Sequence, residues 1–219
     1  MVEAIKAVRL IDKSGAEKKL LENKYSKLAN DEAIRKTMEA LLKNGITSFV
    51  FVTVDEVKKK LFELLPENAE VMDMTSVTLK KLGISDEIFN SGKYDSLRKK
   101  LGSLDDKLRR KLSCVADFSI GSVHAVTLNG EILIASATGS QLAAYAYGSG
   151  KVIWIVGTQK IVKDREEGMK RLYEYCLPLE NERAKKVYKS PSKMGKILTI
   201  NSETPGRLTI LFIKQNIGF

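Results

Sequence analysis

The chain has 219 residues, of which 43% are hydrophobic and 29% are charged, and this balance excludes an intrinsically disordered protein. Its two cysteines, Cys114 and Cys176, lie far apart and form no CxxC pair, so a disulfide framework and a zinc ribbon are excluded as well. No apolar stretch approaches the length of a membrane span, and the N-terminus lacks the apolar core of a signal peptide. We therefore expect a soluble, cytoplasmic protein that has no membrane partner.

The net charge is +10, from 37 basic and 27 acidic residues. The excess is concentrated in two segments, Lys93 to Leu112 and Asn181 to Phe219. A basic excess favours association with polyanions, but the sequence has no helix-turn-helix pattern, no aromatic RNA-binding strand and no Cys/His finger. We interpret the charge as solvated helix faces, and we do not expect a nucleic-acid partner.

The first predicted elements are helical. Residues Glu17 to Asn44 show a helical pattern in two pieces, and Asn30 or Asp31 is placed to cap the second piece. We take residues 1–44 as an N-terminal helical extension. A single α/β domain is then expected to span residues 45–219.

Helices and strands alternate in the next part of the chain. In order, the predicted segments are the strand Thr47 to Val52, the helix Asp55 to Leu65, the strand Ala69 to Met74 and the short helix Val77 to Leu82. Alternation of this kind predicts an α/β fold with a mostly parallel sheet flanked by helices. A basic helix is expected from Leu104 to Leu112.

The most regular pattern lies between Ala116 and Val162. There the strand Glu131 to Ser136 leads into an Ala-Thr-Gly-Ser loop, a small-residue helix from Gln141 to Tyr147, and a second strand from Lys151 to Val156. We expect these two strands to be parallel neighbours joined by a right-handed crossover.

The C-terminal part begins with two predicted helices, Lys163 to Leu177 and Pro178 to Tyr188. Two strands come next, Ile197 to Ile200 and Leu208 to Ile213, separated by a turn. We expect them to form a hairpin, which would make the sheet mixed.

Ligands of open α/β sheets bind beyond the carboxyl ends of the strands. Four such ends are Thr53, Asp73 to Ser76, Thr138 to Ser140 and Gly157 to Lys160. We expect the loop around Gly139 to present free N–H groups at a helix start, which suits a phosphate or a carboxylate, with Lys160 neutralising the anion. Equally, Ser140 and Thr75-Ser76 could be simple helix caps, and Lys160 an ordinary surface lysine.

Two further residues are weak catalytic candidates. Asp117 lies in the apolar run Cys114 to Ile120, where a buried carboxylate would be either a general base or an acceptor for loop amides. His124 is the only histidine, so it is either an acid–base group in a pocket or a structural side chain. Neither a nucleophile motif nor a metal-ligand motif is present, and we expect no metal and no cofactor.

Several segments, in order along the chain, together resemble one family. The longest of these segments is GSVHAVTLNGEILIASATGSQLAAYAYGSGKVIWIVGTQKIVKD, and the others are TSVTLKKLGI, ADFSI and TPGRLTILFIKQNIGF. Over about residues 30 to 219 the chain resembles the LUD-domain, or lactate-utilisation protein, family. The resemblance implies a fold similar to sugar-phosphate isomerases and CoA transferases, with a Rossmann-like sheet. It also implies an accessory part in the oxidation of L-lactate to pyruvate, alongside iron–sulfur oxidoreductase partner proteins.

The resemblance also implies which residues line a shared pocket. Those positions are Thr75, Ser76, Thr78, Ser122, His124, Thr138, Gly139, Ser140, Gly157 and Lys160. The chain departs from the family in having no cysteine between Pro178 and Lys196, and in having His124 where relatives often have asparagine.

Three functions stay open at this point. The first is an accessory subunit that binds a small anionic ligand, the second a stand-alone isomerase or CoA-transferase-like enzyme, and the third a non-catalytic interaction module. A homodimer is compatible with all three.

Overall fold

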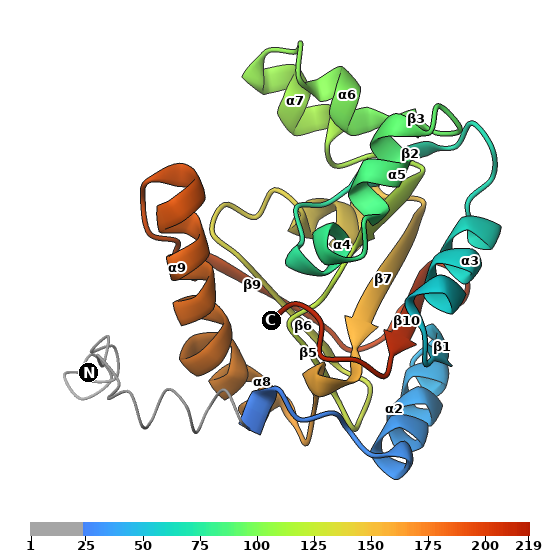
Figure 1. The fold of residues 1–219 in the computed structure, drawn as a ribbon, viewed down its shortest axis with the longest axis vertical. Coiled ribbons are helices and arrows are strands. Elements are labelled where there is room, and N and C mark those ends of the chain that lie inside the picture. The colour runs from blue at the N-terminus through green and yellow to red at the C-terminus, as the bar shows by residue number, and fades with distance from the viewer. Residues whose placement is uncertain (1–23) are drawn as a thin grey trace.

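The computed structural model describes residues 24–219 (Figure 1). Residues 1–23 lie outside the described part, and with them lies most of the first of the two helices expected in the N-terminal extension. The central element is a six-stranded sheet in the order β1-β10-β7-β4-β2-β3, and all of its neighbouring strands are parallel. Its strands are β1 (Thr47–Phe51), β2 (Glu70–Asp73), β3 (Asp95–Ser96), β4 (Phe118–Gly121), β7 (Lys151–Gly157) and β10 (Leu208–Ile213).

A second sheet has four strands in the order β8-β5-β6-β9. Within it β6 pairs antiparallel with both β5 and β9, whereas β5 and β8 are parallel. The strands are β5 (Ala125–Thr127), β6 (Ile132–Ser136), β8 (Ile161–Val162) and β9 (Lys196–Ile200).

The helices begin where the sequence provides caps. Asn30 accepts the Ala33 N–H and starts α2, and Thr53 forms a reciprocal capping box with Glu56 at the start of α3. The helices are α2 (Asp31–Lys43), α3 (Val54–Leu64), α4 (Val77–Lys81), α5 (Ile84–Asn90), α6 (Leu97–Leu101), α7 (Asp106–Leu112), α8 (Arg165–Arg171) and α9 (Leu177–Tyr188). None of the helices in the described residues is long and apolar enough to cross a membrane.

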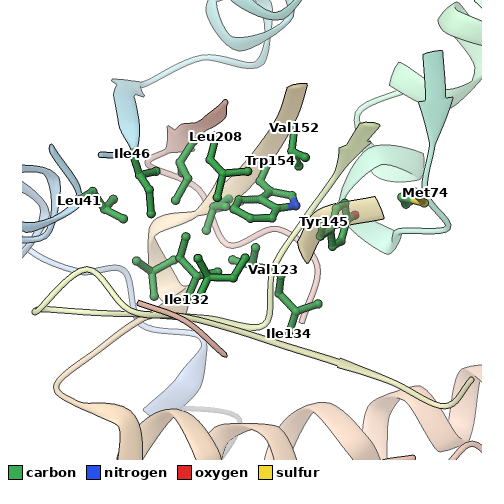
Figure 2. Packing of buried hydrophobic residues seen from close by; sticks show 14 of the residues in the cluster. Leu41, Ile46, Met74, Val123, Ile132, Ile134, Tyr145, Val152, Trp154 and Leu208 are labelled. Carbon is green, nitrogen blue, oxygen red and sulfur yellow. The ribbon is translucent and has the colours of Figure 1, made fainter. Parts of the chain in front are cut away.

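Alternation along the central strands explains the layered packing. In β7, Val152, Trp154 and Val156 face the second sheet, whereas Ile153 and Ile155 pack under α3, α4 and α5. Figure 2 shows the first face, where Trp154 lies between Leu208 and Ile132 and meets the ring of Tyr145 edge-on. A third cluster joins α8 to the outer face of the second sheet. The order is therefore helices, parallel sheet, second sheet, helix.

A single π-helical turn, Leu172–Cys176, connects α8 to α9. Pro178 is the second residue of α9, and a proline has no N–H to donate to the preceding turn. A wider turn before the proline accommodates this loss while the chain stays helical, and π-turns of this kind are frequent near functional sites.

The predicted α/β class with a mostly parallel sheet is confirmed. The expected crossover is wrong, because β6 and β7 belong to different sheets. The expected hairpin is wrong as well, because β9 pairs with β6 while β10 lies between β1 and β7. In both cases the apolar run is buried by a stacked sheet, and burial by stacking gives the same sequence pattern as burial by pairing.

Close packing at Gly121 yields a stability prediction. A Cβ at this position would lie 1.8 Å from the Tyr145 hydroxyl oxygen, and that oxygen has no hydrogen-bond partner within residues 24–219. We expect Gly121→Ala to lower the free energy of unfolding by about 1–3 kcal/mol, as overpacking does in cores. Chemical denaturation measures this loss.

The same site offers its own rescue and a control. Tyr145→Phe removes the clashing oxygen, so the double variant should recover most of the stability lost in Gly121→Ala. Gly102→Ala should have little effect, because Gly102 has a φ of −61° and its nearest neighbouring atom would be 3.5 Å from the new Cβ. Equal losses in the single and the double variant would contradict the steric explanation.

Candidate functional site

A cleft of about 910 Å³ lies at the carboxyl ends of β2, β4 and β7. Loops after these strands form one wall, and the segment after β6, α9 and the chain end form the others. Among the lining residues are Thr75, Ser76, Thr78, Ser122, His124, Thr138, Ser140 and Lys160, which are eight of the ten positions implied by the family resemblance. The structure thus brings together side chains that are up to 85 positions apart in the sequence (160 − 75 = 85).

Lys160 is the central charged group of the cleft. It ends the 3-10 turn Thr158–Lys160 that comes after β7, and its side chain is 1% exposed. Its Nζ lies 3.0 Å from Ser122 Oγ, 3.0 Å from the Val123 carbonyl oxygen and 3.4 Å from Thr78 Oγ1. All of these partners, within the described residues, are neutral oxygens. Burial lowers the pKa of Lys160 to about 7, and the positive charge of Arg171 is the second-largest cause of this decrease.

Arg171 is a second fully buried cation beside the cleft. Its Nη1 donates to the His124 carbonyl oxygen at 2.5 Å and lies 2.9 Å from Cys176 Sγ, and its guanidinium lies 5.2 Å from the centre of the Tyr175 ring. Nε and Nη2 of Arg171 have no hydrogen-bond partner among residues 24–219. The guanidinium of Arg171 therefore adds a second positive charge next to His124, which lines the cleft.

His124 lines the cleft as a neutral ring. Its Nδ1 accepts the Ala135 N–H at 3.2 Å, which leaves the ring proton on Nε2. Burial lowers the pKa of His124 to about 3, with smaller contributions from the charges of Lys160 and Arg171. At neutral pH this histidine can donate one hydrogen bond, but it cannot act as a cation.

More positive charge surrounds the cleft opening. Lys80, Lys81 and Lys193 line it, whereas Glu180, the acidic lining residue within residues 24–219, forms a double hydrogen bond with Arg183 at 2.7 Å for each contact. The charge available to a ligand is therefore positive, and it favours an anion.

The Gly139 loop differs from the sequence expectation. Gly139 has the expected positive φ of 86°, but its N–H donates to Ser136 Oγ at 2.9 Å, and the Ser140 N–H donates to Thr138 Oγ1 at 3.3 Å. The Lys196 side chain covers the loop and donates to the Thr138 carbonyl oxygen. The amides of Gly139 and Ser140 are thus already bonded, so the free N–H groups expected around Gly139 are not found at these two residues. The positive charge near the cleft comes instead from the side chains of Lys160, Arg171, Lys80, Lys81 and Lys193.

Gly157 and Asp117 are not among the cleft-lining residues. Gly157 permits close packing, because a Cβ there would lie 2.1 Å from Gln159 Oε1. Asp117 is exposed and precedes β4, at the end of the strand opposite to the cleft. Thr75 and Ser76 line the cleft but also have structural roles: Arg98 donates to Thr75 Oγ1 at 3.5 Å, and Ser76 caps α4.

Sequence reasoning missed the contribution of the chain end and of α9. Phe219 and Cys176 line the cleft, and Gln159 Nε2 donates to the Ile217 carbonyl oxygen at 2.9 Å, which holds this end over the strand edge. A Cβ on Gly218 would lie 2.2 Å from Thr78 Oγ1 and 3.4 Å from Lys160 Nζ. The Ile-Gly-Phe ending contributes to the family resemblance, but nothing in its composition indicates a site.

The protonation state of His124 gives a prediction that nuclear magnetic resonance can check. Because the chain has one histidine, its ring signals are unambiguous. We expect the neutral form with the proton on Nε2 and no titration between pH 5 and 8, since the pKa of His124 is about 3. A midpoint near the ordinary histidine pKa, about 6.5, would contradict the buried environment.

Replacing Lys160 should stabilise the protein. Below pH 7 the folded protein bears the full cost of a buried ammonium, because both the folded and the unfolded states are protonated there. As pH rises above 7 the folded state loses the proton first, and the cost declines until the unfolded lysine titrates at about pH 10.4. We expect Lys160→Met to unfold at a higher denaturant concentration than wild type. The difference in unfolding free energy between the two proteins should decrease by about 2–4 kcal/mol between pH 7 and pH 10. A difference in unfolding free energy that stays constant over this pH range would contradict this explanation.

Comparisons with known proteins agree with this picture. The LUD-domain family model matches residues 34–213. The structure is similar to that of a DUF162 family protein from Deinococcus radiodurans, with a TM-score of 0.53 at 12% identity, covering 85% of this chain and 99% of that chain. At this identity the similarity shows the fold alone.

Two other solved structures match smaller parts. One is eIF2B beta from Chaetomium thermophilum, with a TM-score of 0.37 at 17% identity, covering 52% of this chain and 44% of that chain. The other is ribose 5-phosphate isomerase from Plasmodium falciparum, with a TM-score of 0.33 at 19% identity, covering 50% of this chain and 52% of that chain. Both TM-scores are too low to assign a function. No curated protein matches the sequence. The family model covers most of the chain, so the protein belongs to the LUD-domain family.

Proposed function

We propose that this protein is an accessory component of L-lactate oxidation, and that its cleft binds a small anion, either a carboxylate or a phosphate. Membership of the LUD-domain family supports the pathway. The observation that supports the ligand is Lys160, a buried lysine whose partners among residues 24–219 are two hydroxyls and one carbonyl oxygen.

The energetics favour an anion over a neutral ligand. Removing an ammonium from water costs several kcal/mol, and neutral hydrogen-bond partners offset only part of that cost. An anion in the cleft would add an opposite charge beside Lys160 and would also interact with Lys80, Lys81 and Lys193. The hydroxyl of Ser122, on the cleft wall, can donate to the same anion, whereas the Thr78 hydroxyl donates to Ser122 Oγ and to the Ile217 carbonyl oxygen.

An accessory role is favoured over a stand-alone isomerase or CoA-transferase-like enzyme. Such an enzyme needs a carboxylate base in its pocket, and the carboxylate that lines this cleft, Glu180, is engaged by Arg183. Asp117, the base proposed from the sequence, lies at the far end of β4. Oxidation of L-lactate to pyruvate releases two electrons, and we assign their transfer to iron–sulfur partner proteins.

Titration calorimetry with L-lactate tests the ligand proposal. The carboxylate of L-lactate stays ionised from pH 6 to pH 9, so any change in affinity over that range reports on the protein. We expect binding that weakens as pH rises above 7, because Lys160 loses its positive charge there. Lys160→Met should weaken binding about tenfold to a hundredfold at pH 6, the effect of removing a charge-assisted hydrogen bond.

A matched control is available on α2. Lys36→Met makes the same charge change at an exposed position outside the cleft, and it should bind L-lactate as wild type does. Inorganic phosphate and pyruvate serve as second probes. If none of the three anions binds to the wild-type protein, the proposed function is wrong.

A further inference from the structure

Lys160 meets the chemical requirements of an amine nucleophile. A lysine amine attacks a carbonyl carbon only when it is neutral, and burial beside another cation is the usual way to reach that state near neutral pH. The groups that act on Lys160 come from several elements. The positive charges of Arg171 and Lys81 disfavour its protonation, whereas Cys176 favours its charged form. His124 shares the same environment as a neutral ring. The result is a pKa of about 7, so a large fraction of the amine is neutral at physiological pH.

The surroundings also provide the other parts that such a reaction needs. Ser122 Oγ, 3.0 Å from Nζ, can donate a proton to a developing oxygen. The positive lining of the cleft holds an ionised carboxylate near the amine. These features together select a small anion that also has a carbonyl group.

We propose that Lys160 forms a reversible imine with the carbonyl carbon of a 2-oxo acid bound in the cleft. The inference rests on the proposed function, since the oxidation of L-lactate yields a 2-oxo acid, pyruvate. It adds a covalent step that simple anion binding does not include.

Atoms and electrons balance in this step. The nitrogen lone pair of Lys160 forms a C–N bond, and the C=O π electrons move to oxygen, which takes up a proton while nitrogen releases one. The resulting carbinolamine loses its hydroxyl group as water after a second protonation, and the nitrogen lone pair forms the C=N bond. Amine, 2-oxo acid and one proton give an iminium ion and water, and hydrolysis reverses the reaction.

Borohydride trapping tests the proposal on the full chain. Protein is incubated with pyruvate, reduced with sodium borohydride, and analysed by intact mass and by peptide mapping. L-Lactate is the matched control ligand, because it has the same carboxylate but no carbonyl group. We expect one reduced pyruvyl group per chain, on Lys160, with pyruvate only.

Variants and pH make the assignment specific. Lys160→Met should lose the adduct while its circular dichroism spectrum stays that of the wild type, and Lys36→Met should keep it. The trapping rate should rise with a midpoint near pH 7, since the neutral amine of Lys160 appears there. An exposed lysine would react only at much higher pH, near its ordinary pKa of about 10.4.

The outcomes separate the two proposals. Calorimetric binding of pyruvate without an adduct on Lys160 overturns the imine and leaves the anion-binding function intact. An adduct that persists in Lys160→Met, or that spreads over surface lysines, overturns the imine as well. Absence of both binding and adduct overturns both proposals.

Discussion

The candidate site depends on one hydrogen-bonded ammonium. Lys160 Nζ contacts Thr78 in α4, which follows β2, and Ser122 and the carbonyl of Val123 in the loop after β4, while Lys160 itself comes after β7. A single side chain thus joins three strand ends of the parallel sheet. None of the described residues that Lys160 contacts has a carboxylate. Lys160 therefore holds these segments together and still leaves a net positive charge in the cleft.

The layered core explains how a buried charge can be tolerated. Two large apolar clusters cover the two faces of the central sheet. One lies under α3, α4 and α5, and the other, shown in Figure 2, lies against the second sheet. Together they bury the alternating side chains of β7 on both faces, including the whole of Trp154. Hydrophobic burial on this scale is the main favourable term in folding, and it offsets the unfavourable term introduced at Lys160. In the anion-binding role that we propose, stability and ligand affinity oppose each other at this residue, as is common at functional sites.

The sequence was sufficient for the α/β class, the main strands and a cap at Asn30 or Asp31, because these features depend on local pattern. Strand partners were not predictable: β6 and β7 are both continuous apolar runs, and such a run does not reveal whether a paired strand or a stacked sheet covers it. The site was predictable in part. Eight of the ten positions implied by the family resemblance line the cleft. The burial of Lys160 depends on Thr78 and Ser122, which are far from it in the sequence, and the bonding of the Gly139 amide depends on how the Ser136 side chain is rotated. Residue spacing encodes neither feature.

The π-helical turn before Pro178 has a consequence for how this cleft arises in evolution. A π-turn holds one residue more than the α-helical turn it replaces, and each helical residue rotates the remainder of the helix by about 100°. Arg183, Ala184 and Val187 all lie beyond it and point into the cleft. Deletion of one residue between Leu172 and Cys176 would restore an ordinary helix and turn this entire surface of α9 away from Lys160. Relatives that differ in length at this turn should therefore present a different set of side chains to their ligand, even where every strand of the sheet is the same.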